Sequence, residues 1–276
     1  MIVGIDIGGT TTKIVGFHDA KIVDLMTIKA SDPITSASGA LGKLMYTNGL
    51  KLTDISKIAI TGVGASYIES DILGIPVVKV NEFEAIGLGG AHLSGMDNII
   101  VLSLGTGSAI VKVESGRITH LGGTGVGGGT LMGLSEAMFG MSDFNEIIEM
   151  AEKGSLENVD LTIGDISKGM VGHLIEDITA SNFGKMNVKA TANDKALGII
   201  NLIFQTIGVI SLFASSATGI KDIVVTGKLG NIDTGKTIIK RLTEFKSFDG
   251  QFVFPDKSEY STALGAAISQ APPDWR

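Results

Sequence analysis

The chain contains no cysteine among its 276 residues. This absence excludes disulfide frameworks, thiolate metal sites, iron–sulfur clusters and cysteine nucleophiles. Positive charge is also scarce, because 22 Lys and Arg stand against 29 Asp and Glu, for a net charge of −7, and no basic run occurs. A protein that tracks a nucleic-acid backbone needs clustered basic residues. The sequence therefore disfavours nucleic-acid binding, and any chemistry must rely on oxygen and nitrogen groups.

Proline and aromatic residues are few, whereas glycine is abundant. The chain has five prolines, 5% aromatic residues and 38 glycines, which is roughly twice the usual glycine share of about 7%. Disordered linkers lose aliphatic residues, but 44% of this chain is hydrophobic. These numbers predict a folded protein with many tight backbone turns and enough chain for two lobes.

One long segment, residues 196–220, carries no charged residue and could span a bilayer by its length alone. Small and polar residues recur in it at helical spacing, and aromatic belts are missing. A helix over residues 197–218, buried in a core or at a subunit interface, is the better interpretation. This helix is one reason to expect a homodimer. The N-terminal residues show no secretory signal pattern, so we expect a cytoplasmic protein and no membrane partner.

Short β-rich runs alternate with turns and helical patterns in the first part of the chain. A three-stranded meander is followed by a helix, two further strands and a second helix. The expected strands are Ile2–Ile7, Lys13–Phe17, Lys21–Ile28, Lys57–Thr61 and Val77–Val80, and the expected helices are Ser38–Asn48 and Glu82–His92.

After Asn98 the opening pattern starts again. The segment IVGIDIGGTTTKIVGF at the N-terminus and IVLSLGTGSAIVKV from Ile99 both read as strand, glycine–threonine turn and strand. A repeat at this long spacing favours a duplicated α/β domain over a solenoid. We expect one lobe from residues 1–95 and another from 96–276, facing each other across a cleft. Later expected elements are the helices Thr130–Phe139, Phe144–Lys153 and Ser261–Ser269, and the strand Ile223–Thr226.

The first glycine turn carries groups that can bind phosphate. Backbone amides, hydroxyls and one lysine converge there on the residues Asp6, Gly8, Gly9, Thr10, Thr11, Thr12 and Lys13. Asp6 ends an apolar strand and would need a counter-ion, for which a hydrated divalent metal is suited. A plain hairpin turn is the alternative. Two more glycine clusters, at 105–107 and 122–129, favour the phosphate interpretation.

The repeated turns make the chain resemble the actin-like ATPase superfamily. The opening DIGGTTTKI resembles its first phosphate motif, SLGTGSAI its second, VVTGKLG its adenosine motif and STALGAAI its second connecting helix. The resemblance covers nearly the whole chain. It implies an α/β fold of two ribonuclease H-like lobes, each with a mixed five-stranded sheet, and a nucleotide cleft between them.

Within that superfamily the chain is similar to type II pantothenate kinases. The similar stretches are VNEFE, where the expected strand Val77–Val80 leads into the second helix, and further along the chain LGGTGVGGGTLMGL and TASNFG. The resemblance implies ATP-dependent phosphorylation of pantothenate, the first step of coenzyme A biosynthesis, with ATP and Mg²⁺ as cofactors and a homodimer. Asp6 would hold Mg²⁺ through water.

The same resemblance implies a role for each site residue. Glu82 would be the catalytic base, although a solvated acid at a helix start would explain it equally well from the sequence alone. Thr106 would face the γ-phosphate or substrate, and Phe144 would lie near adenine; an ordinary turn hydroxyl and a core aromatic are the alternatives. The other implied nucleotide residues are Gly128, Gly129, Thr130, Gly227 and Lys228, and the other implied substrate residues are His120 and Asn182.

His120 stands where the resembled family has an arginine that grips the substrate's carboxylate. Imidazole can donate a hydrogen bond but lacks the guanidinium fork. A kinase of another small alcohol, such as an N-acetylated amino sugar, is therefore an alternative. A nucleotide-dependent switch or assembly protein is a second one. The lack of cysteine disfavours the repressor–kinase branch, with its zinc site, and excludes dehydratase-activating ATPases, with their cluster.

Overall fold

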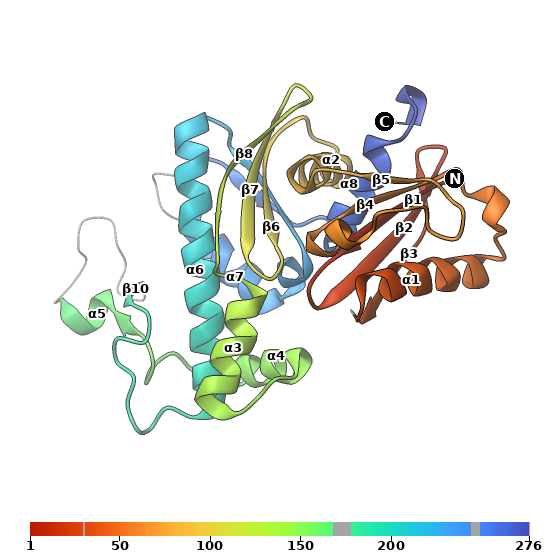
Figure 1. Ribbon diagram of the computed structural model, residues 1–276. Coiled ribbons are helices and arrows are strands. Elements are labelled where there is room, and N and C mark those ends of the chain that lie inside the picture. The colour runs from red at the N-terminus through yellow and green to blue at the C-terminus, as the bar shows by residue number, and fades with distance from the viewer. Residues whose placement is uncertain (30, 168–177, 244–248, 276) are drawn as a thin grey trace.

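A computed structural model describes every residue of the chain except 30, 168–177, 244–248 and 276. Two five-stranded sheets lie on either side of a pair of helices, α2 and α8 (Figure 1). The helices are α1 (Pro33–Asn48), α2 (Glu82–Ser94), α3 (Gly128–Phe139), α4 (Phe144–Glu152), α5 (Ile163–Ile166), α6 (Ala192–Thr218), α7 (Asp233–Leu242) and α8 (Ser261–Ser269).

The first sheet has the order β3-β2-β1-β4-β5, with its meander antiparallel and its β1–β4 and β4–β5 pairs parallel. Its strands are β1 (Ile2–Ile7), β2 (Thr11–His18), β3 (Lys21–Lys29), β4 (Lys57–Thr61) and β5 (Val77–Lys79). Alternate residues of β1 and β2 point to opposite faces. Ile5, Ile7 and Ile14 pack against α1 on one face, while Ile2 and Val15 pack against α8 on the other.

The second sheet repeats this arrangement, with the order β8-β7-β6-β11-β12 and the same pattern of antiparallel and parallel pairs. Its strands are β6 (Asn98–Leu104), β7 (Ser108–Glu114), β8 (Arg117–Thr124), β11 (Asp222–Thr226) and β12 (Gln251–Val253). The predicted duplication is therefore confirmed. Asp6 pairs with Thr61 in the first sheet as Ser103 pairs with Thr226 in the second.

Helices α2 and α8 cross between the sheets in direct backbone contact. A Cβ added at Gly89 of α2 would overlap the carbonyl oxygen of Ser261, and one added at Gly265 of α8 would overlap that of Ala85. Only glycine allows this approach. Helix α8 also packs on β1 and β2, so the end of the chain returns to the first sheet. The division of the chain into lobes after residue 95 stays a prediction.

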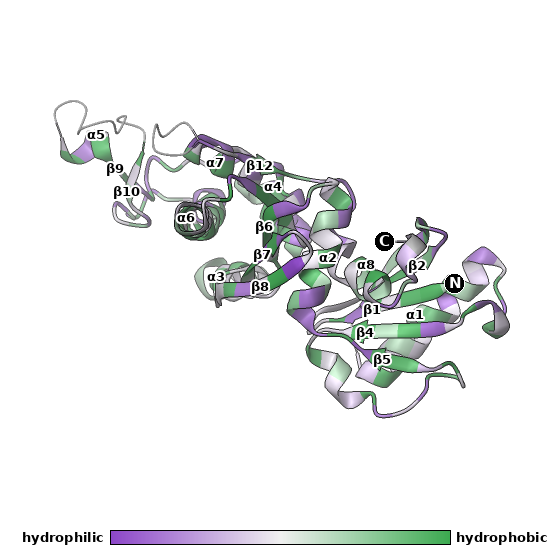
Figure 2. Cartoon of the chain, turned by 90° about the horizontal axis from the view of Figure 1, so that it is seen from above, coloured by the Kyte–Doolittle hydropathy of each residue, from purple (hydrophilic) through white to green (hydrophobic). Residues whose placement is uncertain are grey.

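Helix α6 is the long helix expected from the uncharged segment. By length and composition it is the one candidate membrane span among the described residues, but 56% of its most apolar window is buried in the protein. Asn201, Ser211 and Ser215, expected on a polar stripe, are themselves buried, whereas Phe213 is exposed. A two-stranded sheet of β9 (Leu161–Thr162) and β10 (Thr179–Ser181) projects with α5 beyond α6, at the end opposite the first sheet (Figure 2).

Local capping groups explain where several helices begin and end. The Asn81 side chain accepts from the amides of Phe83 and Glu84 and so starts α2 at Glu82. Helix α1 begins earlier than expected, because the Asp32 carboxylate caps it by accepting from Thr35. The sequence patterns did not reveal α7, β12 or the two-stranded sheet of β9 and β10.

Candidate active site

Glu82 lies at the first turn of α2, near the carboxyl end of β1. It is exposed to solvent, yet the protein that surrounds its carboxyl raises its pKa, and the negative charge of Asp6 raises it further. The two acids are therefore close enough to interact. A carboxylate whose proton affinity is increased in this way is suited to accept a proton from an alcohol.

Asp6 is held by a charge from the neighbouring strand. Asp6 and Lys13 are direct antiparallel partners, and Lys13 Nζ lies 3.7 Å from Asp6 Oδ2. Burial raises the pKa of Asp6, and Lys13 partly offsets this. The counter-ion expected for Asp6 is thus available within the protein itself.

Thr12 corrects one expectation from the sequence. Its neighbours Thr11 and Lys13 share the face of Asp6, but Thr12 pairs with Ile7 and points to the opposite face. Thr12 is fully buried there, so its hydroxyl does not lie with the groups of Asp6 and Lys13, where the sequence predicts it. The strand alternation that places Lys13 beside Asp6 necessarily turns Thr12 to the opposite face.

The first two glycine turns are closed in the same way. The Gly8 amide donates to Thr11 and the Gly105 amide donates to Gly107. Among the described residues, the amides of Gly9, Thr10 and Thr106 have no recorded partner, and all three residues are exposed. Open amides at the ends of β1 and β6 are the groups that an anion could use.

The third glycine cluster behaves differently from expectation. The Gly128 amide donates to Gly105 (2.9 Å) and the Gly129 amide to Thr106 (2.8 Å), while the Thr130 hydroxyl donates to Gly125. The expectation that the first amides of α3 are free for phosphate is therefore wrong for Gly128 and Gly129. These bonds instead fix the second turn against the start of α3.

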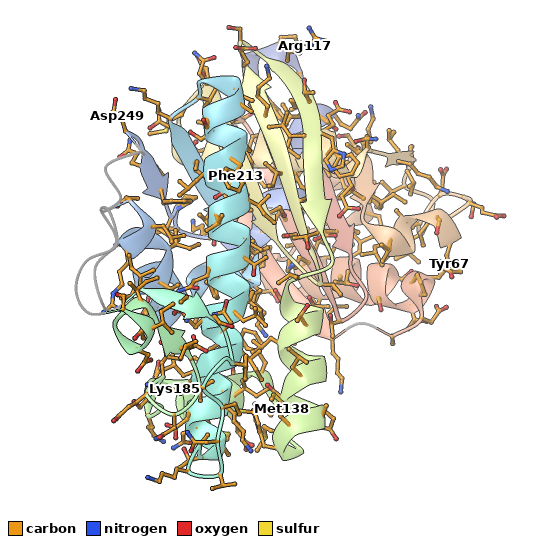
Figure 3. All side chains as sticks on the ribbon, turned by 90° about the vertical axis from the view of Figure 1, so that its left-hand side faces the viewer. Tyr67, Arg117, Met138, Lys185, Phe213 and Asp249 are labelled. Carbon is orange, nitrogen blue, oxygen red and sulfur yellow. The ribbon has the colours of Figure 1, made fainter. Side chains whose placement is uncertain are left out.

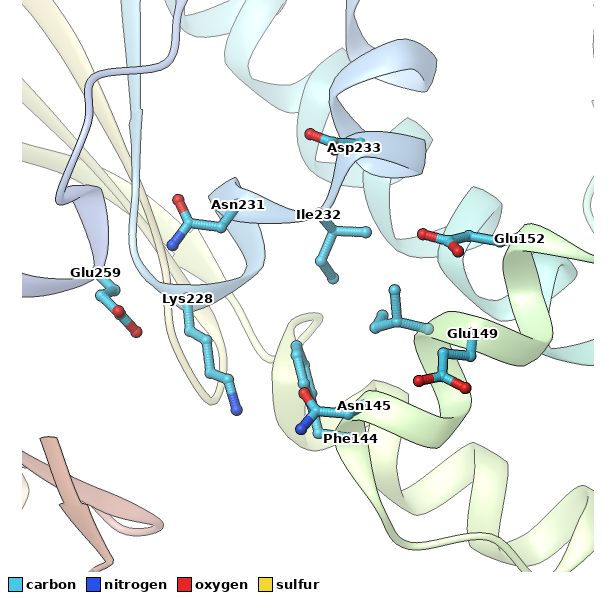
Figure 4. Close-up of a pocket in the computed structure, with 10 residues that line it drawn as sticks. Phe144, Asn145, Glu149, Glu152, Lys228, Asn231, Ile232, Asp233 and Glu259 are labelled. Atoms are coloured by element: carbon cyan, nitrogen blue, oxygen red, sulfur yellow. The ribbon is translucent and has the colours of Figure 1, made fainter.

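Phe144 and Lys228, 84 residues apart in the sequence, meet at a pocket of about 500 Å³. Lys228 Nζ lies 3.8 Å from the centre of the Phe144 ring (Figure 4), within cation–π range. Gly227 precedes Lys228 with φ +90°, and a Cβ there would overlap the carbonyl of Leu104. The pocket is lined by Phe144, Asn145, Ile148, Glu149, Glu152, Lys228, Asn231, Ile232, Asp233 and Glu259.

Asn182 does not lie with the other expected site residues. Its amide donates to Asp160 (3.3 Å) and Gln205 (3.4 Å), in a polar cluster where the buried Asp160 also accepts from Asn201 and from the Phe183 amide. This cluster lies beside β10 and α6, away from the first sheet (Figure 1). The role of Asn182 in substrate binding stays a prediction.

His120 lies flat against Phe83, the residue after Glu82. The ring centres are 3.7 Å apart and the planes differ by 11°. Sequence reasoning missed Phe83, although its position beside Glu82 was a usable signal. It also missed the pocket residues of α4, whose spacing over Asn145, Ile148, Glu149 and Glu152 marks one helix face.

The duplicated sheets, with open turns at the ends of β1 and β6, define an actin-like ATPase fold. Solved structures with this fold include the activator of the 2-hydroxyisocaproyl-CoA dehydratase from Clostridium difficile, with TM-score 0.69, 18% identity and coverage of 97% of this chain and 93% of that one. A ROK family glucokinase from Streptomyces griseus has TM-score 0.63, 13% identity and coverage of 97% and 98%.

The family is more specific than the fold. Residues 97–269, more than half of the chain, match the family model described as Fumble, and the chain belongs to this family. The type II pantothenate kinase of Bacillus cereus strain G9842 is 29% identical, over 96% of this chain and 97% of that enzyme. That of Oceanobacillus iheyensis is 29% identical, over 97% and 98%.

Proposed function

We propose that the protein is a pantothenate kinase, which transfers the γ-phosphoryl group of ATP to the primary hydroxyl of pantothenate and so begins coenzyme A biosynthesis. Relatives that carry the name type II pantothenate kinase align over nearly their whole length, and the Fumble family supports the same activity. Glu82 carries the proposal at the level of chemistry, because it is an acid of raised pKa beside Asp6 and Lys13.

Phosphoryl transfer depends on positioning and charge stabilisation more than on covalent chemistry. Glu82 would accept the hydroxyl proton as the oxygen attacks the γ-phosphorus. Lys13 and the open amides of Gly9, Thr10 and Thr106 would stabilise the phosphate oxygens. Thr11, half-buried on the Lys13 face, would add a hydroxyl. The pocket of Phe144 and Lys228 would take the adenine, since it combines an aromatic face with hydrogen-bonding groups.

Asp6 is suited to hold Mg²⁺ through water rather than directly. Among the described residues there is no group of three or more His, Asp or Glu that could bind a metal. Mg²⁺ keeps several waters and is commonly held by one or two carboxylates together with substrate phosphates. One carboxylate at the cleft therefore fits. The ion would supply neutralisation of phosphate charge.

Substitution of Glu82 tests the proposal. Glu82→Gln keeps the size of the side chain but removes the base, so kcat should fall by about 10²–10⁴-fold with little change in the KM for ATP. Glu84→Gln is the matched control, because Glu84 lies in the same first turn and is exposed; it should keep kcat within about twofold. Wild-type turnover in Glu82→Gln would remove the assigned base.

His120 favours a second candidate, a kinase of another small alcohol such as an N-acetylated amino sugar. It offers a single hydrogen-bond donor where the resembled family has an arginine. A panel of hydroxylated acceptors at matched concentration with Mg·ATP separates the two. Turnover of a sugar without turnover of pantothenate would decide for the second candidate. ATP hydrolysis that no acceptor changes, with nucleotide-dependent polymerisation, would favour an assembly protein.

A cytoplasmic homodimer is part of the proposal. The outer face of α6 exposes Phe213 (69%) and Val209 (39%), one helical turn apart, and Phe213 stands on the surface of the helix (Figure 3). Exposed apolar residues of this size on a helix favour burial against a partner. Because dimer formation is favoured at higher protein concentration, the free energy of unfolding would then increase with protein concentration.

A further inference from the structure

Helix α2 runs along the edge strand β8 with matched spacing. Gly87 of α2 packs on Ile118 of β8, since a Cβ at Gly87 would lie 2.9 Å from that side chain. Four residues earlier on α2, Phe83 packs on His120, two residues later on β8. Four helical residues rise about 6 Å and two strand residues rise about 6.6 Å. The two contacts therefore form one antiparallel ladder, and His120 lies at the Glu82 end of it.

His120 ends an apolar row. Ile118 and His120 lie opposite Val113 and Val111 and so share their face, which packs against Ile86 and the half-buried Phe83. The pairing of β7 and β8 is then irregular, and β8 continues through Gly122 and Gly123, which pair with Ile110 and Ala109. His120 is exposed, and no described residue forms a hydrogen bond with either of its ring nitrogens. One ring face is covered by Phe83, and the ring edge is open.

We propose that Phe83 is a positioning residue that fixes the His120 imidazole, so that its edge donates to a polar or anionic group of the acceptor. This inference rests on the proposed function, because an acceptor whose hydroxyl meets Glu82 must extend past the neighbouring His120. An imidazole confined by a stacked ring loses less side-chain freedom when the acceptor binds. Phe83 therefore acts on acceptor affinity through His120 and touches no substrate itself.

A double-mutant cycle tests this role. Phe83→Leu should raise the KM for the acceptor about 3–10-fold, while kcat and the KM for ATP stay within about twofold. Phe83→Tyr keeps the ring and should restore the wild-type KM. In a His120→Ala background, Phe83→Leu should add less than about twofold, because the partner is gone. Phe254→Leu is the control, because the Phe254 ring lies elsewhere, against Lys240 of α7. This variant should leave kcat and the KM values for the acceptor and for ATP unchanged.

An independent measurement follows the stack without substrate. The imidazole protons of His120, assigned through His120→Ala, should show an upfield ring-current shift in NMR that Phe83→Leu removes. Phe83→Met replaces the leucine variant if that variant does not fold. A fall in kcat with unchanged acceptor KM would overturn the proposal. So would a double variant in which the effects of Phe83→Leu and His120→Ala on the acceptor KM simply multiply, or the absence of the ring-current shift in the wild-type protein. A wild-type protein that phosphorylates no acceptor would instead overturn the proposed function, while the NMR result still decides on the stack.

Discussion

At the scale of single residues, the candidate site contains two acids, Asp6 and Glu82, whose pKa values are both raised. Asp6 is buried and paired with Lys13, and Glu82 lies within its electrostatic reach. Glu82 stands at the start of α2, where the helix dipole favours a negative charge, yet its pKa is raised by the desolvation of its carboxyl by the surrounding protein and by the charge of Asp6. The raised pKa is what distinguishes Glu82 from the acid of an ordinary helix start.

This arrangement predicts a pH dependence. A base works deprotonated, so kcat/KM should fall as the pH decreases through the pKa of Glu82, which lies above its ordinary value of about 4.3. Asp6→Asn removes a neighbouring negative charge and should lower that pKa, shifting the acid limb to lower pH. Its activity should also be lower throughout, since Asp6 would help to hold Mg²⁺. A pH profile of kcat/KM for both proteins is the measurement; an unmoved limb would contradict the coupling.

At the scale of elements, the sequence predicted most strands and helices because their patterns are local. Apolar runs on either side of Gly–Thr turns indicated β1, β2, β6 and β7. Helix α7 (DTGKTIIKRL) was missed because half of its residues are Gly, Thr or Ile, which have low helix propensity. Strand β12 (QFV) was missed because it has only three residues. What the patterns could not show is the backbone contact of α2 with α8, which depends on glycines of two distant segments.

The α2–α8 crossing gives a prediction on stability. Gly89→Ala should lower the free energy of unfolding by about 1–3 kcal/mol through overpacking against Ser261. Gly39→Ala in α1 is the matched control, since Gly39 is exposed and a Cβ there meets nothing within 4 Å; it should stabilise by about 0.4–1 kcal/mol. Chemical denaturation of both variants measures the difference. Equal effects would mean that the crossing is not tightly packed.

At the scale of the whole molecule, the exposed face of α6 is a candidate for subunit contact. Phe213→Glu should convert the proposed homodimer to monomers, because a charge would be buried at the contact. Tyr46→Glu on α1 is the control, because Tyr46 is 90% exposed; it should leave the assembly unchanged. Sedimentation velocity over a range of concentrations distinguishes these outcomes. A dimer that survives Phe213→Glu would place the interface elsewhere.

The sequence by itself determined the duplication, the glycine turns and the absence of thiol chemistry. Each of these follows from local pattern or composition, which does not depend on the rest of the fold. The choice of Glu82 as the base came from the resemblance to type II pantothenate kinases and stays a prediction. Only the tertiary structure decided that Thr12 faces the core, that the Gly128 and Gly129 amides are already bonded, and that Asn182 lies apart. It alone brought Phe83 to His120 and Phe144 to Lys228. These pairs come from segments far apart in the chain, and contacts between such segments form only when helices pack on sheets.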